Sequence, residues 1–184
     1  MARRAITAQL TGLAALAGMS GPELGARTVV LIDGRSGSGK TTLARQLKPL
    51  LDAQLVSLDD VYPGWDGLRA GSEAVPTMLS RGRPGWRGGI WAAEPGVWHD
   101  LDPDMPLIIE GCGALSAASR IQSSFGIYLD VPRRIRKRRA LEREPEFRAH
   151  WRGWAVQERD HARRERPREL ADVVIDGWIG VTSS

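Results

Sequence analysis

The chain has 184 residues, 42% of them hydrophobic and 26% charged, which is the size and composition of one α/β domain with a sizeable core. A formal charge of +4 is too small to indicate a nucleic-acid partner, and none is expected. The single cysteine excludes an intrachain disulfide, so we expect a reducing, cytoplasmic setting, and no stretch is long enough to span a membrane.

The first predicted element is a helix over residues 5–17. Apolar side chains at Ile6, Leu10 and Leu13 fall on one helical face, which predicts an amphipathic helix packed near the sheet. Two arginines ahead of this run also fit a weak secretory signal, but polar residues interrupt its apolar stretch. We therefore favour the helix, which the Gly-Pro pair at 21–22 should end.

Residues 28–33 predict a buried strand, because apolar or β-branched residues in a row end at an Asp-Gly corner. The next residues match G-x-x-x-x-G-K-[ST] at every fixed position: Gly34, Arg35, Ser36, Gly37, Ser38, Gly39, Lys40, Thr41 and Thr42. A glycine-rich loop between a strand and a helix turns backbone amides toward phosphate oxygens. We expect Lys40 to reach the β- and γ-phosphates and the Thr41 hydroxyl to complete a Mg²⁺ shell. The sequence thus predicts that this segment binds a nucleoside triphosphate, ATP, with Mg²⁺.

A helix that begins at Lys40 should end or kink near Lys48, because Pro49 removes a backbone donor. Residues 55–58 then predict a second strand. A pair of aspartates at 59–60 follows that strand, and their role depends on which other residues lie beside them at the edge of the sheet.

Between residues 62 and 106 the periodic signal disappears, and many glycines, tryptophans and arginines occur. A loop-rich stretch of this length inside a compact domain is usually functional, so we take 63–106 as an insertion on the acceptor side. With Tyr62 nearby, four tryptophans are candidates to stack on a substrate ring: Trp65, Trp86, Trp91 and Trp98. Three arginines of the same stretch are candidates to hold a phosphate: Arg81, Arg83 and Arg87. Alternatively, the tryptophans form the small core of a loop subdomain. We expect at least one to line the acceptor pocket.

Regular elements return after this insertion. They are strands over 107–111 and 125–130, helices over 132–143 and 146–166, and a last strand over 173–176. Strands that alternate with helices predict a P-loop NTPase fold, a doubly wound, five-stranded parallel sheet with helices on both faces. The helices over 132–166 form an Arg-rich lid and the helix after it. No repeat or linker is visible, so residues 1–184 are taken as one domain.

Acidic side chains should gather at the carboxyl ends of these strands, where such sheets carry their sites. Asp59 and Asp60 follow the second strand, and Glu110 ends the next. Carboxylates beside a triphosphate repel it unless one holds a metal and another takes a proton, the two roles that phosphoryl transfer needs. Which aspartate is the base stays open, and the other would cap the following turn. The three histidines and the cysteine show no metal-ligand spacing, so no zinc site is expected.

Arginines on the predicted lid helix form a further candidate group. Arg136, Arg139 and Arg143 lie at i, i+3 and i+7 and share one helical face. A charge run of this kind is often a solvated basic face. Beside a phosphate loop it has a second interpretation, as guanidinium clamps on transferring charge, carried on a mobile lid.

The phosphate loop, Asp59 three residues before Tyr62, and the apolar run ending in Glu110-Gly111 resemble the uridine kinase and phosphoribulokinase group of P-loop kinases. The arginine spacing after Asp130 is similar to that group's lid helix, and residues 171–176 resemble its closing strand. Together these similarities cover about half of the chain.

This resemblance implies roles for particular residues. Asp59 would accept the proton of the acceptor hydroxyl, and Glu110 would help to hold Mg²⁺ in place of the more usual Asp. The lid arginines would stabilise the phosphates. The chain departs from the group over 63–106, so the resemblance implies no contact with the acceptor.

Three functions fit these observations. The leading hypothesis is a Mg²⁺- and ATP-dependent kinase that phosphorylates a hydroxyl of a small molecule, foremost a nucleoside. A kinase for nucleoside monophosphates, sugars or other metabolites is the second, because arginines in the insertion would suit an acceptor that carries phosphate. The third is a regulatory or RNA-binding protein that uses ATP only as a ligand, and three convergent carboxylates argue against it. A homodimer is left open.

Overall fold

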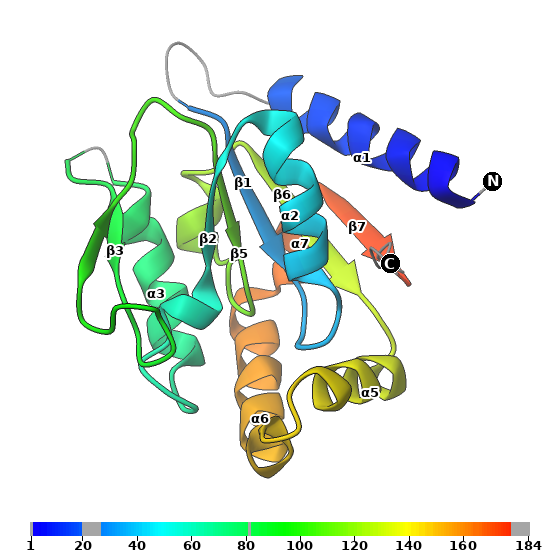
Figure 1. Cartoon of the computed structure of the whole chain (residues 1–184), viewed down its shortest axis with the longest axis vertical. Coiled ribbons are helices and arrows are strands. Elements are labelled where there is room, and N and C mark those ends of the chain that lie inside the picture. The colour runs from blue at the N-terminus through cyan, green and yellow to red at the C-terminus, as the bar shows by residue number, and fades with distance from the viewer. Residues whose placement is uncertain (1, 20–26, 81, 178–184) are drawn as a thin grey trace.

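A computed structural model gives the fold and describes residues 2–19, 27–80 and 82–177, with side chains from residue 8 onward. Figure 1 shows a central sheet with helices packed on both sides of it. The helices are α1 (Ala2–Met19), α2 (Lys40–Leu51), η1 (Leu58–Asp60), α3 (Leu68–Met78), α4 (Ala117–Arg120), α5 (Arg133–Arg143), α6 (Phe147–Glu165) and α7 (Pro167–Leu170). The strands are β1 (Val29–Asp33), β2 (Gln54–Ser57), β3 (Gly85–Arg87), β4 (Trp98–Asp100), β5 (Leu107–Glu110), β6 (Phe125–Asp130) and β7 (Val173–Asp176).

The main sheet has five parallel strands in the order β2-β5-β1-β6-β7, which confirms the predicted architecture. In the central strand, Leu31 lies in register between Ile109 of β5 and Gly126 of β6. All five residues of β1 are buried, as expected for a strand covered on both faces. Because parallel strands end at one edge, the residues that follow β1, β2 and β5 meet there.

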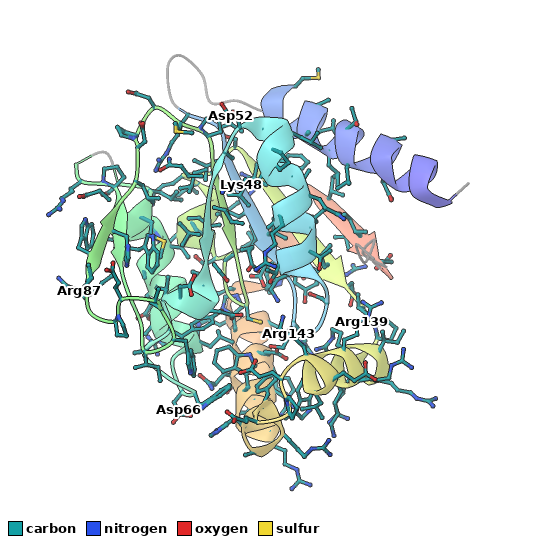
Figure 2. All side chains as sticks on the ribbon, in the orientation of Figure 1. Lys48, Asp52, Asp66, Arg87, Arg139 and Arg143 are labelled. Atoms are coloured by element: carbon teal, nitrogen blue, oxygen red, sulfur yellow. The ribbon has the colours of Figure 1, made fainter. Side chains whose placement is uncertain are left out.

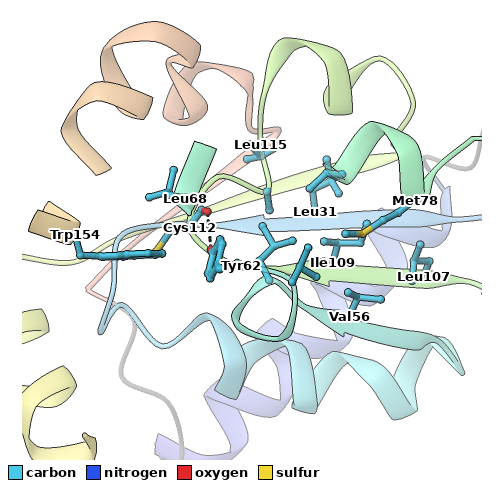
Figure 3. Packing of buried hydrophobic residues seen from close by; sticks show 14 of the residues in the cluster. Leu31, Val56, Tyr62, Leu68, Met78, Leu107, Ile109, Cys112, Leu115 and Trp154 are labelled. Carbon is cyan, nitrogen blue, oxygen red and sulfur yellow. Dashed lines mark hydrogen bonds between the residues drawn. The ribbon is translucent and has the colours of Figure 1, made fainter. Parts of the chain in front are cut away.

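Two hydrophobic cores lie on opposite faces of the sheet, because neighbouring residues of a strand point to opposite sides. Ile32 packs with Leu43 of α2 and with Leu13 of α1, so the predicted N-terminal helix is confirmed. Leu31 faces the other core, to which α3 and α6 contribute and in which Trp154 is buried (Figure 3). Within the described residues, no helix combines the length and hydropathy that a membrane crossing needs.

Helix α6 extends beyond the carboxyl edge of the sheet, next to α5 and close to the loop that joins β1 to α2 (Figure 1). Its side chains reach two separate segments of the chain. Glu158 contacts the backbone of Ser36, and Gln157 donates to the backbone carbonyl of Trp65 at 2.7 Å. One helix therefore holds both the phosphate loop and the start of the 63–106 segment.

Of the two outcomes expected at Pro49, an end of helix α2 near Lys48 is wrong, because the helix continues through Pro49 to Leu51. Proline removes only one hydrogen bond, and the backbone amides of Asp52 and Ala53 both close onto the Lys48 carbonyl, which completes the last turn. The predicted end of α1 at the Gly-Pro pair lies outside the described residues.

The 63–106 segment is not loop-rich throughout, because it contains α3 and the antiparallel hairpin β3–β4. The buried side of α3 follows the helical spacing, but two of its positions carry Gly71 and Ser72, so few large apolar residues mark it in the sequence. Gly71 packs against the ring of Tyr62, where a Cβ would lie 2.4 Å from Cδ1. The small residue thus allows the close approach that the sequence pattern did not reveal.

Candidate functional site

The phosphate loop has the backbone geometry that its motif predicts. Gly37 and Gly39 have φ of 79° and 98°, which L side chains rarely adopt, and the Ser38 amide donates to the Arg35 carbonyl at 3.1 Å. A Cβ on Gly37 would lie 2.1 Å from the backbone oxygen of Arg136, so the loop packs directly on the first turn of α5. The Ser38 hydroxyl is buried and has no hydrogen-bond partner among the described residues.

Asp33, at the end of β1, anchors the loop from beneath, a role that the sequence analysis missed. Its carboxylate accepts hydrogen bonds from the amides of Gly34 at 2.5 Å, Leu115 at 2.9 Å and Gly113 at 3.2 Å. His161 of α6 approaches the same carboxylate at 3.6 Å. This buried group therefore joins the phosphate loop to the loop that follows β5.

Lys40, the first residue of α2, is only 7% exposed, and its Nζ lies 3.5 Å from Sγ of Cys112. Burial alone would lower the pKa of Lys40, but Cys112, Glu110 and nearby aspartates more than offset it, and the pKa is raised. The ammonium is therefore charged at neutral pH. Burial raises the pKa of Cys112 to about 12, so the thiol is neutral. Cys112 was not predicted, although its position just after β5 is the kind of signal that marks a site residue.

Thr41, Ser57 and Glu110 form a compact oxygen cluster beside Lys40. Oε1 of Glu110 accepts from the Thr41 hydroxyl at 3.0 Å and from the Ser57 hydroxyl at 2.8 Å. Desolvation raises the pKa of this buried carboxyl, against the opposing effect of Lys40. A hydroxyl and a carboxylate side by side fit a Mg²⁺ ion that completes its shell with phosphate oxygens and water. Among the described residues no group of three or more His, Cys, Asp or Glu could hold a metal unaided.

Asp59 and Asp60 lie in η1, directly after β2, and differ in their surroundings. Asp59 is exposed and lines a cavity that also reaches Ser36 of the phosphate loop. Asp60 is half-buried and does not line it, and desolvation, followed by repulsion from Asp59, raises its pKa. The position of Asp59 at this cavity favours it as the base.

The cavity beside Asp59 has a volume of about 170 Å³ and largely aromatic walls. Its lining residues are Ser36, Asp59, Tyr62, Trp65, Trp91, Arg143, Glu144, Phe147 and Trp154. Trp65 is held on several sides: it stacks on His150 with ring centroids 4.1 Å apart and meets Trp91 edge-on at 4.7 Å. The hydroxyl of Tyr62 is already engaged, because it donates to the Cys112 carbonyl at 2.8 Å (Figure 3).

Of the residues expected at the acceptor site, Trp86 does not line this cavity, and Arg81 cannot be compared with it. Trp86 lies in the β3–β4 hairpin, stacked on His99 at 4.2 Å, and is absent from the cavity wall. Arg81 lies outside the described residues. Trp91 lines the cavity instead of Trp86. Phe147 and Trp154 of α6 also line it, because α6 returns to this edge of the sheet from far along the sequence.

The three predicted lid arginines have three different settings. Arg136 is 4% exposed, and its guanidinium donates to the carbonyls of Val131 at 2.9 Å and Ser36 at 3.0 Å. Arg143 lines the aromatic cavity, at the end of α5 nearer α6 (Figure 2). Arg139, which lies between Arg136 and Arg143 in the sequence of α5, is half-buried. Contact of all three with phosphate stays a prediction.

Comparison with solved structures identifies the fold. The chain superposes with a TM-score of 0.60 and 21% identity on a protein described as a possible uridine kinase from Bacillus stearothermophilus, over 93% of this chain and 99% of that one. The chain has the P-loop NTPase fold. The same fold is found in a shikimate kinase from Acinetobacter baumannii, with a TM-score of 0.53 and 20% identity over 85% and 87% of the two chains. A protein assigned as a fructose transport system kinase from Silicibacter sp. TM1040 gives 0.57 and 20% over 90% and 98%.

Comparison with curated protein sequences matches a shorter part of the chain. Forty-two residues, or 22% of the chain, are 48% identical to the tRNA dimethylallyltransferase of Chlamydia trachomatis serovar D. The chain covers 13% of that enzyme's length. No family model matches the sequence.

Proposed function

We propose that the chain is a Mg²⁺- and ATP-dependent kinase that transfers the γ-phosphoryl group to a hydroxyl of a small molecule, with a nucleoside as the leading acceptor. The observation that carries this proposal is the cavity shared by Ser36 and Asp59. Into the same space as the phosphate loop it brings the carboxylate of Asp59, which makes no hydrogen bond with the part of the chain that the structure describes. Binding a nucleotide does not require such a base, whereas deprotonating an alcohol does.

The proposed reaction uses each group of the site once. Asp59 takes the proton of the acceptor hydroxyl while the hydroxyl oxygen bonds to the γ-phosphorus of ATP. The bond from that phosphorus to the β–γ bridging oxygen breaks, which releases ADP. The loop amides and the Lys40 ammonium hold the phosphate charge. Thr41 and Glu110 would hold Mg²⁺, which supplies positive charge to the phosphate oxygens.

The walls of the cavity favour an unphosphorylated acceptor with a flat ring. Aromatic side chains offer faces on which a base can stack. Two of the arginines in the insertion that had favoured a monophosphate are engaged elsewhere: Arg83 pairs with Asp100 at 2.7 Å, and Arg87 donates to the Gly96 carbonyl. A volume of about 170 Å³ is below the usual range of ligand pockets, so a compact sugar or other metabolite is the alternative acceptor.

A coupled ADP-release assay tests the proposal with a panel of nucleosides, their monophosphates and sugars, each compared with the ATP-only rate. We expect nucleosides to raise turnover most, and Trp65→Ala to raise the acceptor KM about tenfold or more, since stacking is worth roughly 1–3 kcal/mol per base. Trp86→Ala is the matched control and should leave that KM unchanged. Turnover at the ATP-only rate with every acceptor, together with intact ATP binding, would favour a nucleotide-binding regulator instead.

A further inference from the structure

A carboxylate of the chain itself is bound to the phosphate loop. Glu158 of α6 is 5% exposed, and its Oε1 accepts the backbone N–H of Ser36 at 2.6 Å. The guanidinium of Arg136 lies 3.9 Å from its other oxygen and at the same time donates to the Ser36 carbonyl. The Cys112 thiol, which contacts Lys40, lies 3.6 Å from Oε1.

These partners are those that a phosphate group would use. Backbone amides of a glycine-rich loop bind anions, and a guanidinium pairs with carboxylate and phosphate alike. A buried carboxylate is costly unless it is paired and hydrogen-bonded, and here the Ser36 amide and Arg136 provide both. The same negative charge opposes a triphosphate that enters the loop.

The position of Ser36 indicates which phosphate is affected. Ser36 and Asp59 line one cavity, so the part of the loop at Ser36 faces the acceptor. In the proposed kinase, the phosphate that faces the acceptor is the one to be transferred. Glu158 therefore stands where the γ-phosphate end of ATP would meet the loop.

We infer that Glu158 is an internal anion that competes with the γ-phosphate of ATP for the Ser36 amide and for Arg136. Binding of the triphosphate exchanges one anion for the other and turns the Arg136 guanidinium from Glu158 to phosphate. This inference rests on the proposed function, because it requires ATP to bind in the loop. It makes Glu158 a positioning residue that selects between triphosphate and diphosphate.

The exchange has a route to the acceptor cavity. Gln157 and His150, on the same helix as Glu158, hold Trp65 by a hydrogen bond and by ring stacking. A movement of α6 that withdraws Glu158 would therefore move the wall of that cavity as well.

Calorimetric titration of the full chain with MgATP and MgADP tests the inference. Glu158→Gln keeps an oxygen for the Ser36 amide and removes the charge, so we expect MgATP to bind about tenfold more tightly, equivalent to about 1.4 kcal/mol. MgADP, which lacks the γ-phosphate, should change by less than about threefold. Asp160→Asn is the matched control, because it removes one charge from an exposed position of the same helix and should change neither affinity.

Equal or weaker MgATP binding by a folded Glu158→Gln variant would overturn the inference, and so would an equal gain for both nucleotides. If that variant does not fold, Glu158→Asp serves in its place, since the shorter side chain draws the carboxylate away from Ser36 and should also tighten MgATP. The wild-type and Asp160→Asn titrations test separately whether the chain binds MgATP, which the proposed function requires. Failure of every variant to bind MgATP would refute both.

Discussion

Substitution of Asp59 by Asn separates the proposed chemistry from a structural role. The Asp59 side chain is exposed and makes no hydrogen bond or ion pair with the described residues, so Asp59→Asn should change the free energy of unfolding by no more than about 0.5 kcal/mol. Loss of a general base costs about 10²- to 10⁴-fold in rate, which corresponds to about 2.7–5.4 kcal/mol in the activation free energy. The expected rate effect is therefore several times larger than any effect on stability.

Single-turnover phosphoryl transfer, thermal unfolding and ATP calorimetry measure these quantities on the same preparation. We expect turnover to fall by that factor while Tm and ATP affinity stay near the wild-type values. Asp60→Asn is the neighbouring control and should retain turnover, because Asp60 does not line the cavity. A mild effect of Asp59→Asn beside a severe effect of Asp60→Asn would reverse the assignment. Mild effects of both would refute general-base catalysis by this pair.

Four further substitutions follow from the geometry. Lys40→Ala should abolish turnover, because it removes the buried ammonium that lies at the loop, and circular dichroism checks that the variant is folded. Since burial raises the pKa of Glu110 above its ordinary 4.5, the folded protein holds that proton more tightly than the unfolded chain, and stability should fall as pH rises from 4.5 through the raised pKa. Glu110→Gln should remove this slope in Tm against pH and, in calorimetry with and without Mg²⁺, the Mg²⁺-dependent part of ATP binding. Gly37→Ala should cost about 2 kcal/mol or more in denaturant unfolding, because it combines left-handed backbone with a Cβ 2.1 Å from a carbonyl. Gly153→Ala, in an open helical position, should instead stabilise by about 0.5–1 kcal/mol.

Much of the fold was predictable because its signals are local. Signals close together in the sequence specify β1, the phosphate loop and the start of α2: a run of apolar residues, a glycine-rich segment and a lysine. The same reasoning predicted β2, which Asp59 follows, and β5, which ends at Glu110. Helix α3 was missed because close packing on Tyr62 requires Gly71, and such a small residue does not mark the buried side in the sequence.

The sequence by itself determined the anion-binding loop, the parallel sheet and the acidic residues at its carboxyl edge. The signals for each strand, for the loop and for the residues that follow a strand are local in the sequence. Only the tertiary structure decided that Trp91 rather than Trp86 lines the cavity, and that Glu158 binds an amide 122 positions away. These contacts arise where α6 returns across the edge of the sheet. Pairs so distant in sequence leave no periodicity or spacing, because burial and charge compensation are satisfied only once the chain has folded.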